Sequence, residues 1–190
     1  MAASNQMTRA IAQLGNLPAF MRQWATSTAF GRTVKFAGTA GIQFESLKPG
    51  EVTCSIANKS HVQNHIGGVH AAAMALLAET ATGFVVGISL PDDKLPLLKS
   101  MHVDYTKRAA GGLRAVATLS PEQIEQLKTQ PKGAVTVPVV VTDKEGKEPI
   151  SAEFVWAWIP KPVKGAAAAA ASKASSAPAD ASAAKPSSKL

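Results

Sequence analysis

Residues 5–30 carry the pattern of an amphipathic helix. Apolar side chains recur every three residues from Ile11 to Phe20, which places them on one face of a helix. Gly15 and Pro18 fall inside this pattern, and both residue types disfavour the interior of a helix. The segment is therefore predicted to form two helices.

Residues 36–57 alternate between apolar and polar side chains, most clearly from Val52 to Ile56. This alternation is typical of half-buried strands. The lysine, proline and glycine at 48–50 lie in the middle of the stretch and are typical of a turn. We predict strands on both sides of this turn.

The longest apolar segment, from Ala71 to Leu90, predicts one buried helix. A polar loop at 64–69 precedes it, Pro91 ends it, and Glu79 is its only charged side chain. The segment is about long enough to cross a membrane. However, a central acid costs roughly 2.5–3.5 kcal/mol there, so no membrane span is expected.

The second half of the chain predicts four strands and one short helix. The strand candidates are rich in β-branched and apolar side chains, and they comprise residues 97–106, 112–119, 135–142 and 150–159. Ser120 followed by Pro121 is a helix start, and this helix is expected to run to about Lys128. Residues 143–147, between the last two strands, predict a hairpin connection.

The order of these elements gives the fold class and the domains. A helical segment (1–35) precedes a domain (36–160) in which antiparallel strands pack on one long helix, an α+β arrangement. Residues 161–190 are predicted to be a flexible tail, because from Gly165 on the chain has no aromatic residue and no large apolar residue before Leu190. Such a segment cannot bury enough surface to offset the entropy of ordering.

The last three residues are Ser188, Lys189 and Leu190. At a C-terminus this tripeptide is a peroxisomal import signal read by a receptor. The alternative is a chance ending in a tail that is rich in serine and lysine. The signal predicts an import receptor as a partner and the matrix of a peroxisome, or of a specialised peroxisome such as a glycosome, as the location.

Composition narrows the classes of function. The net charge is +7, but the five Lys and one Asp of residues 161–190 contribute +4, so the rest is only mildly basic. No helix-turn-helix signal, basic run interleaved with aromatics or zinc spacing is found, so neither a nucleic-acid partner nor a metal site is expected. Cys54 is the single cysteine, which excludes an intramolecular disulfide and fits a reducing compartment.

The apolar helix and the loop before it contain the candidate chemistry. Gly67 and Gly68 allow a ligand to approach the backbone closely. The first N–H groups of the helix, at Ala71 and Ala72, have no intrahelical partner and carry partial positive charge, which suits a carbonyl or an oxyanion. Glu79 can act as a general base or a nucleophile, and burial is expected to raise its pKa.

The spacing between these groups implies a site shared by two chains. Glu79 lies eight residues after Ala71, which is ~12 Å along one helix, so one carbonyl cannot reach both. Two antiparallel copies of the helix in a two-fold dimer would bring them together. Taken singly, each residue has a simpler alternative role. Glu79 could be a structural acid, His70 a cap, and Asn64 a loop residue bonded to local backbone.

One group of residues resembles a family motif. It comprises Asn64, Gly67, His70, Ala71, Ala72, Glu79, Thr80, Ala81 and Gly83. Their spacing resembles the hotdog-fold acyl-CoA thioesterases, in the branch related to phenylacetate-pathway and 4-hydroxybenzoyl-CoA thioesterases, and is especially similar to an uncharacterised subgroup. The strand sequences at 97–112 and 139–160 also fit, so the resemblance covers about residues 36–160.

The resemblance implies a hotdog fold, in which an antiparallel sheet wraps around one long central helix. It implies hydrolysis of an acyl-CoA to an acid and CoA by a homodimer or a dimer of dimers, with no cofactor apart from the CoA of the substrate. By resemblance, Glu79 is the base or nucleophile. The Ala71 N–H and Asn64 of the neighbouring chain act on the carbonyl, and His70 has a supporting role.

Two features depart from the family pattern. The family has two glycines where this chain has Ala71 and Ala72. Related enzymes also hold the attacking water with a Ser or Thr on the strand after the helix. Leu98 takes that place here, and Ser100, expected on the same side of the strand, is the candidate substitute.

Lys107 and Arg108, at the end of the same strand, are candidates for binding the CoA phosphates. The alternative for both is a solvated strand end. The departures keep a non-catalytic protein that binds acyl-CoA or lipid open as an alternative function. A hotdog hydratase is a third class, but no matching His-Asp hydration motif is found.

Overall fold

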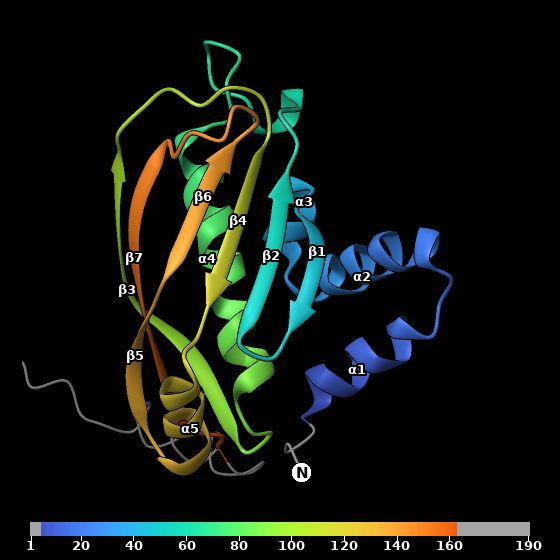
Figure 1. Cartoon of the computed structure of the whole chain (residues 1–190), viewed down its shortest axis with the longest axis vertical. Coiled ribbons are helices and arrows are strands. Elements are labelled where there is room, and N and C mark those ends of the chain that lie inside the picture. The colour runs from blue at the N-terminus through green and yellow to red at the C-terminus, as the bar shows by residue number, and fades with distance from the viewer. Residues whose placement is uncertain (1–4, 163–190) are drawn as a thin grey trace, which may run out of the picture. The chain divides into compact units, whose positions relative to one another are not determined.

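The computed structural model describes residues 5–162. Residues up to Pro160 form one compact unit (Figure 1). The predicted tail (161–190) lies outside the described residues from residue 163 on, and this part includes its final Ser188, Lys189 and Leu190.

The described residues form five α-helices, one 3-10 helix and seven strands. The helices are α1 (Gln6–Gly15), α2 (Ala19–Thr33), α3 (Lys35–Ala40), η1 (Ser60–Val62), α4 (Ala71–Ser89) and α5 (Pro121–Thr129). The strands are β1 (Gln43–Lys48), β2 (Glu51–Ile56), β3 (Lys94–Tyr105), β4 (Leu113–Thr118), β5 (Gly133–Val137), β6 (Val139–Asp143) and β7 (Ile150–Pro160).

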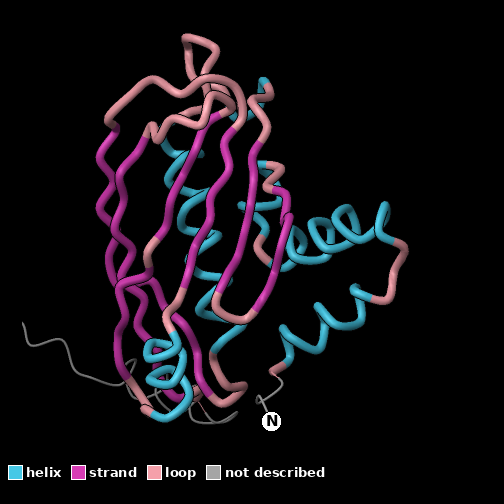
Figure 2. Tube along the Cα trace, in the orientation of Figure 1, coloured by secondary structure: helices cyan, strands magenta, loops and turns pink. Residues whose placement is uncertain are grey.

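The strands form two antiparallel sheets around α4. One sheet has the order β1-β2-β4-β6 and the other the order β3-β7-β5. The long helix α4 contacts strands of both sheets and passes behind them in Figure 2. The predicted α+β class, with antiparallel strands packed on one long helix, is confirmed.

The core lies between α4 and the sheets. Leu77, Ala81 and Val85 of α4 are completely buried. Phe84 stacks at 4.4 Å between ring centroids on Phe44 of β1, and at 5.2 Å on Phe30 of α2. The aromatic cluster therefore fixes α2 and β1 against the central helix, at separations where ring pairs are favourable.

The N-terminal helices break where the sequence predicts it. Gly15 ends α1, and α2 begins after Pro18. The Asn5 side chain caps α1 by accepting from the Thr8 N–H at 2.7 Å, and it donates to three backbone carbonyls at the end of α4. The Asn5 amide thus provides hydrogen-bond partners both for a free N–H at the start of α1 and for free carbonyls at the end of α4.

Three expectations about strands are wrong. Residues 36–40 are helical rather than extended, with Ala37 and Ala40 buried at helical spacing and Gly41 at φ 71° ending α3. The predicted strand over 135–142 is divided at Pro138, which has no N–H for a ladder; β5 pairs with β7, and β6 pairs with β4. Consequently β6 and β7 belong to different sheets. Residues 143–147 therefore connect the two sheets and are not the turn of a β-hairpin.

Helix α4 is long and apolar enough to cross a membrane by length and composition alone. Most of it is buried inside the protein, which is the pattern of a core helix. Among the described residues it is the only helix that meets this criterion.

Candidate active site

The start of α4 presents one backbone N–H group without a partner. His70 is the N-cap, and its Nδ1 accepts a hydrogen bond from the Ala72 N–H at 3.0 Å. The Ala71 N–H bonds to no group within residues 5–162. Of the two N–H groups predicted for a carbonyl, the Ala71 group is therefore available and the Ala72 group is used by the cap.

Tyr105 holds this helix start in place. Its hydroxyl donates to the Ala71 carbonyl at 2.8 Å, joining the end of β3 to the first turn of α4. Burial raises the pKa of the Tyr105 hydroxyl, so it stays a protonated donor at neutral pH. Sequence analysis gave this residue no role, although it is the single tyrosine of the chain.

The loop before α4 is built around Asn64. Its Oδ1 accepts from the N–H groups of Ile66 and Gly68, each at 3.1 Å, and its backbone N–H donates to the Gly68 carbonyl. Gly67 adopts φ 75°, as expected, but Gly68 does not have a positive φ. Because the Asn64 oxygen is used by the loop, only its amide N–H groups are left for a substrate carbonyl.

Glu79 is half-buried on α4, and burial raises the pKa of its carboxyl. The hydroxyl of Thr80 opposes part of this shift. The helix backbone here is fixed from the sheet, since Trp156 donates to the Thr82 hydroxyl at 3.0 Å and Thr82 donates to the Glu79 carbonyl at 2.9 Å. Thr82 and Trp156 are positioning residues that sequence analysis missed.

The small residue at Gly83 makes this arrangement possible. A Cβ there would lie 2.8 Å from the Trp156 ring, closer than carbon atoms approach without strain. Glycine therefore lets the Trp156 indole approach α4 closely, one helical turn after Glu79. This gives a packing reason for the Gly83 of the motif.

The face of β3 next to α4 is uncovered. Three of its side chains are exposed to 36%, 56% and 50%, and they are Leu98, Met101 and Tyr105. Their register partners on β7 are the buried residues Trp156, Phe154 and Ile150. Paired residues share a sheet face, so the core face of β7 continues onto β3 without a cover from the described residues.

The expected orientation of Ser100 is wrong. A bulge shifts the register between Leu98 and Ser100, so that Leu98 pairs with Trp156 whereas Ser100 pairs with the adjacent Val155. Neighbouring residues of a strand point to opposite faces. Ser100 therefore faces away from α4 and cannot hold water beside Glu79 of its own chain.

A pocket of about 180 Å³ gives access to the first turn of α4. His61, His70 and Ala72 line it together with Phe36 and Thr39 of α3. The candidate carbonyl site at the helix start is therefore reached from the side of α3 as well as from the open face of β3.

Lys107 and Arg108 are exposed in the loop after β3. Lys107 lines a surface hollow of about 600 Å³ together with Lys147 and Glu148. It lies two residues after Tyr105, which contacts the helix start, so it is close in sequence to the site. The Arg108 side chain makes no ion pair within residues 5–162.

Clusters of metal-ligating side chains and the single cysteine were also compared with the site. No cluster of three His, Cys, Asp or Glu side chains suited to a metal occurs within residues 5–162. Burial raises the pKa of Cys54 to about 12, which keeps it a thiol, and the thiolate is the reactive form. Glu79, in the middle of α4, is the carboxyl whose pKa burial raises.

The fold is shared with solved proteins. A structural genomics protein is 27% identical, with a TM-score of 0.65 and coverage of 82% of this chain and 99% of that chain. A Pseudomonas aeruginosa protein named a probable thioesterase is 23% identical, with a TM-score of 0.60 and coverage of 76% and 97%. A Haemophilus influenzae thioesterase is 14% identical, with a TM-score of 0.54 and coverage of 66% and 82%.

The arrangement of antiparallel sheets around the long helix α4 is the hotdog fold of these solved structures. Residues 22–159 match the family described as "Domain of unknown function (DUF4442)", and the chain belongs to this family. No curated protein matches the chain.

Proposed function

We propose that the protein hydrolyses acyl-CoA thioesters at a site shared by two chains. The observation that carries this proposal is the pairing of a half-buried carboxyl with raised pKa, Glu79, and an unpartnered N–H at Ala71. The names of the P. aeruginosa and H. influenzae proteins of the same fold agree with the reaction class.

The reaction needs both groups at one thioester carbonyl. The Glu79 carboxylate takes a proton from water, whose oxygen attacks the carbonyl carbon. The Ala71 N–H of the other chain stabilises the negative oxygen that forms. The tetrahedral intermediate then breaks its carbon–sulfur bond, and the CoA sulfur leaves with the proton held by Glu79. In the alternative route the Glu79 carboxylate attacks the carbon itself and the carbon–sulfur bond breaks, so that CoA leaves as its thiolate. Water then hydrolyses the resulting anhydride to the acid and the Glu79 carboxylate, and the proton released in this step balances the CoA thiolate.

A second chain can be accommodated on the uncovered face. The partly exposed stripe of α4 comprises Ala72, Ala75, Leu76 and Glu79, and it adjoins the exposed apolar face of β3 at Leu98 and Met101. Small residues let a second helix approach closely, and antiparallel pairing about a two-fold axis would place Glu79 of one chain toward Ala71 of the other. A dimer, or a dimer of dimers, is the assembly that completes the proposed site.

One observation favours a second candidate function. Because Ser100 faces away from α4, the inner face of β3 offers Leu98 and Met101, but no serine or threonine, near the carboxyl. A protein that binds acyl-CoA without hydrolysing it is the alternative that follows.

A panel of acyl-CoAs with short, long and aromatic acyl groups separates the two functions. We expect release of free thiol from at least one member of the panel, followed with a thiol reagent on the full chain. Isothermal titration of each acyl-CoA runs in parallel. Tight binding across the panel without thiol release would overturn hydrolysis in favour of the binding function.

We also propose that the protein acts in the peroxisome, where acyl-CoA substrates would be met. The proposal is supported by the terminal Ser188, Lys189 and Leu190, since the import receptor needs this tripeptide at the free C-terminus. Addition of one residue after Leu190 is expected to move a fluorescently tagged protein from punctate organelles to the cytosol. A matched fusion with the unextended C-terminus is the control, and organelle targeting that survives the extension would refute the proposal.

A further inference from the structure

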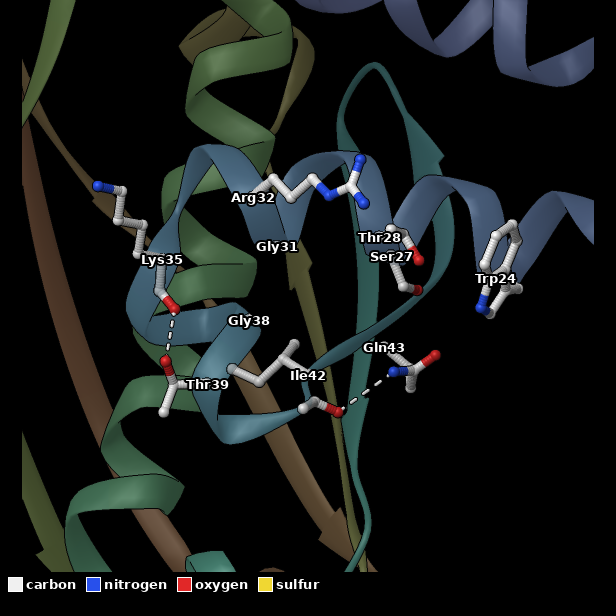
Figure 3. Close-up of a pocket in the computed structure, with 11 residues that line it drawn as sticks. Trp24, Ser27, Thr28, Gly31, Arg32, Lys35, Gly38, Thr39, Ile42 and Gln43 are labelled. Carbon is white, nitrogen blue, oxygen red and sulfur yellow. Dashed lines mark hydrogen bonds between the residues drawn. The ribbon is translucent and has the colours of Figure 1, made fainter.

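A groove of about 590 Å³ lies between α2, α3 and the start of β1, outside the candidate active site. Figure 3 shows Trp24, Thr28 and Gln43 on one side of it, with the Arg32 side chain extending towards them and the Lys35 side chain extending away on the opposite side. Gly31 and Gly38 line it where α2 and α3 meet, and a Cβ on Gly38 would collide with the Gly31 carbonyl. Glycine at this position therefore lets the two backbones come into close contact.

The groove is positively charged without any compensating acid. Residues 1–44 contain no acidic side chain and four basic ones, namely Arg9, Arg22, Arg32 and Lys35. Arg32 and Lys35 line the groove and make no ion pair within residues 5–162. The nearest acid along the chain, Glu45, is already paired with Arg114 at 2.8 Å. Two cations that line one groove without an ion pair favour an anion, and phosphate in particular.

The groove also offers an aromatic surface and a buried hydroxyl. Trp24 is 66% exposed, so its ring can stack on a planar base. Ser27 is buried, and its Oγ accepts from the Phe44 N–H at 2.9 Å. The Ser27 hydroxyl proton is donated to no group among the described residues, so it can serve a ligand. Phosphate and a flat ring together indicate a phosphorylated nucleoside.

The groove continues toward the start of α4. Thr39 lines it and also lines the pocket of about 180 Å³ that contains His70 and Ala72. A ligand can therefore place its nucleotide in the groove and extend past α3 to the Ala71 N–H. A CoA thioester is such a molecule, with a phosphorylated adenosine at one end and the reacting carbonyl at the other.

We propose that this groove binds the 3′-phosphoadenosine diphosphate end of the CoA thioester. The inference rests on the proposed function and deepens it by locating the nucleotide. It moves the phosphate site away from the expected Lys107 and Arg108. In the hollow beside Lys107 the second ammonium, of Lys147, is already paired with Glu145 at 2.8 Å, and Glu148 adds a negative charge.

Direct binding tests the groove without any chemistry. The full chain is titrated with adenosine 3′,5′-bisphosphate by calorimetry, and stacking on Trp24 is followed as fluorescence quenching that Trp24→Phe removes. The double change Arg32→Ala with Lys35→Ala is expected to weaken binding on the order of tenfold or more. Arg22→Ala is the matched control, because Arg22 lies on the same helix but donates to the Leu17 carbonyl. The Arg22→Ala protein should bind adenosine 3′,5′-bisphosphate as tightly as the unchanged protein does.

Kinetics with two substrates separate this inference from the proposed function. The double change should raise KM for an acyl-CoA and leave KM for the matching acyl-pantetheine, which lacks the nucleotide, unchanged. If the double change leaves KM for acyl-CoA unaltered, or if Lys107→Ala raises this KM instead, the groove does not bind the nucleotide. The proposed hydrolysis would then still stand. The protein could instead bind the nucleotide through Arg32 and Lys35 but hydrolyse no thioester. This result would overturn the proposed function and support the groove as a nucleotide site.

Discussion

Glu79→Gln is expected to lower the rate of thioester hydrolysis by roughly 10²–10⁴-fold, the contribution of a positioned general acid or base. Glutamine keeps the shape of the side chain but can neither accept a proton from water nor attack the carbonyl carbon. The rate is measured as thiol release from the best acyl-CoA of the panel. Binding of that acyl-CoA should persist, because the groove and the Ala71 N–H are unchanged.

Stability is the control for this substitution. The raised pKa means that the folded protein holds the Glu79 proton more tightly than the unfolded chain does. Ionised Glu79 therefore destabilises the folded state as pH rises through the folded pKa, and an uncharged glutamine relieves this cost. The variant should melt at the same or a higher temperature near neutral pH. Activity within a few-fold of the unchanged protein would exclude Glu79 as base or nucleophile.

The pH profile of the unchanged protein is a second readout of the same residue. Only the ionised carboxylate is competent, so kcat/KM should rise with pH through a midpoint above that of an exposed glutamate. The direction follows from burial, which raises the pKa of Glu79. A rate that is flat down to the ordinary pKa of a glutamate would contradict the assignment.

Much of the fold could be predicted because its signals are local. The apolar run of α4, the break between Gly15 and Pro18, and the Ser120 cap of α5 are each specified by neighbouring residues. The capping box at Ser120 is complete in the structure, as its sequence indicates. Short segments were harder, since six residues of α3 are too few to separate a helical period from an alternating one.

The residues of the candidate site could be predicted only where they share one helix or loop. Glu79, Ala71 and His70 lie on or next to α4, so their spacing fixes their relative positions. Tyr105 and Trp156 reach that helix from strands, and the pairing register that brings them there is not visible in local sequence. The bulge before Ser100 is likewise not visible in local sequence, yet its one extra residue reverses the face of every side chain after it.

The second large effect is expected from Ala71→Pro, which removes the candidate carbonyl donor and little else. Proline has no N–H, yet it is favoured at the first position of a helix. His70 already has φ −63° and ψ 144°, the conformation that a residue before proline adopts. The Ala71 carbonyl, which accepts from Tyr105, is retained. Loss of one such donor lowers kcat by roughly 10²–10³-fold.

Ala71→Gly is the matched control, because it keeps the N–H and removes only a methyl group, so its kcat should stay near that of the unchanged protein.

Mixed dimers then test whether the site is shared. When Glu79→Gln and Ala71→Pro chains are refolded together in equal amounts, about half of the dimers contain one of each. Each mixed dimer combines the intact Glu79 of one chain with the intact Ala71 of the other at one of its two sites. We therefore expect recovery to about a quarter of the unchanged activity. No recovery in dimers shown by mass to be mixed would mean that Glu79 and Ala71 do not act across the interface.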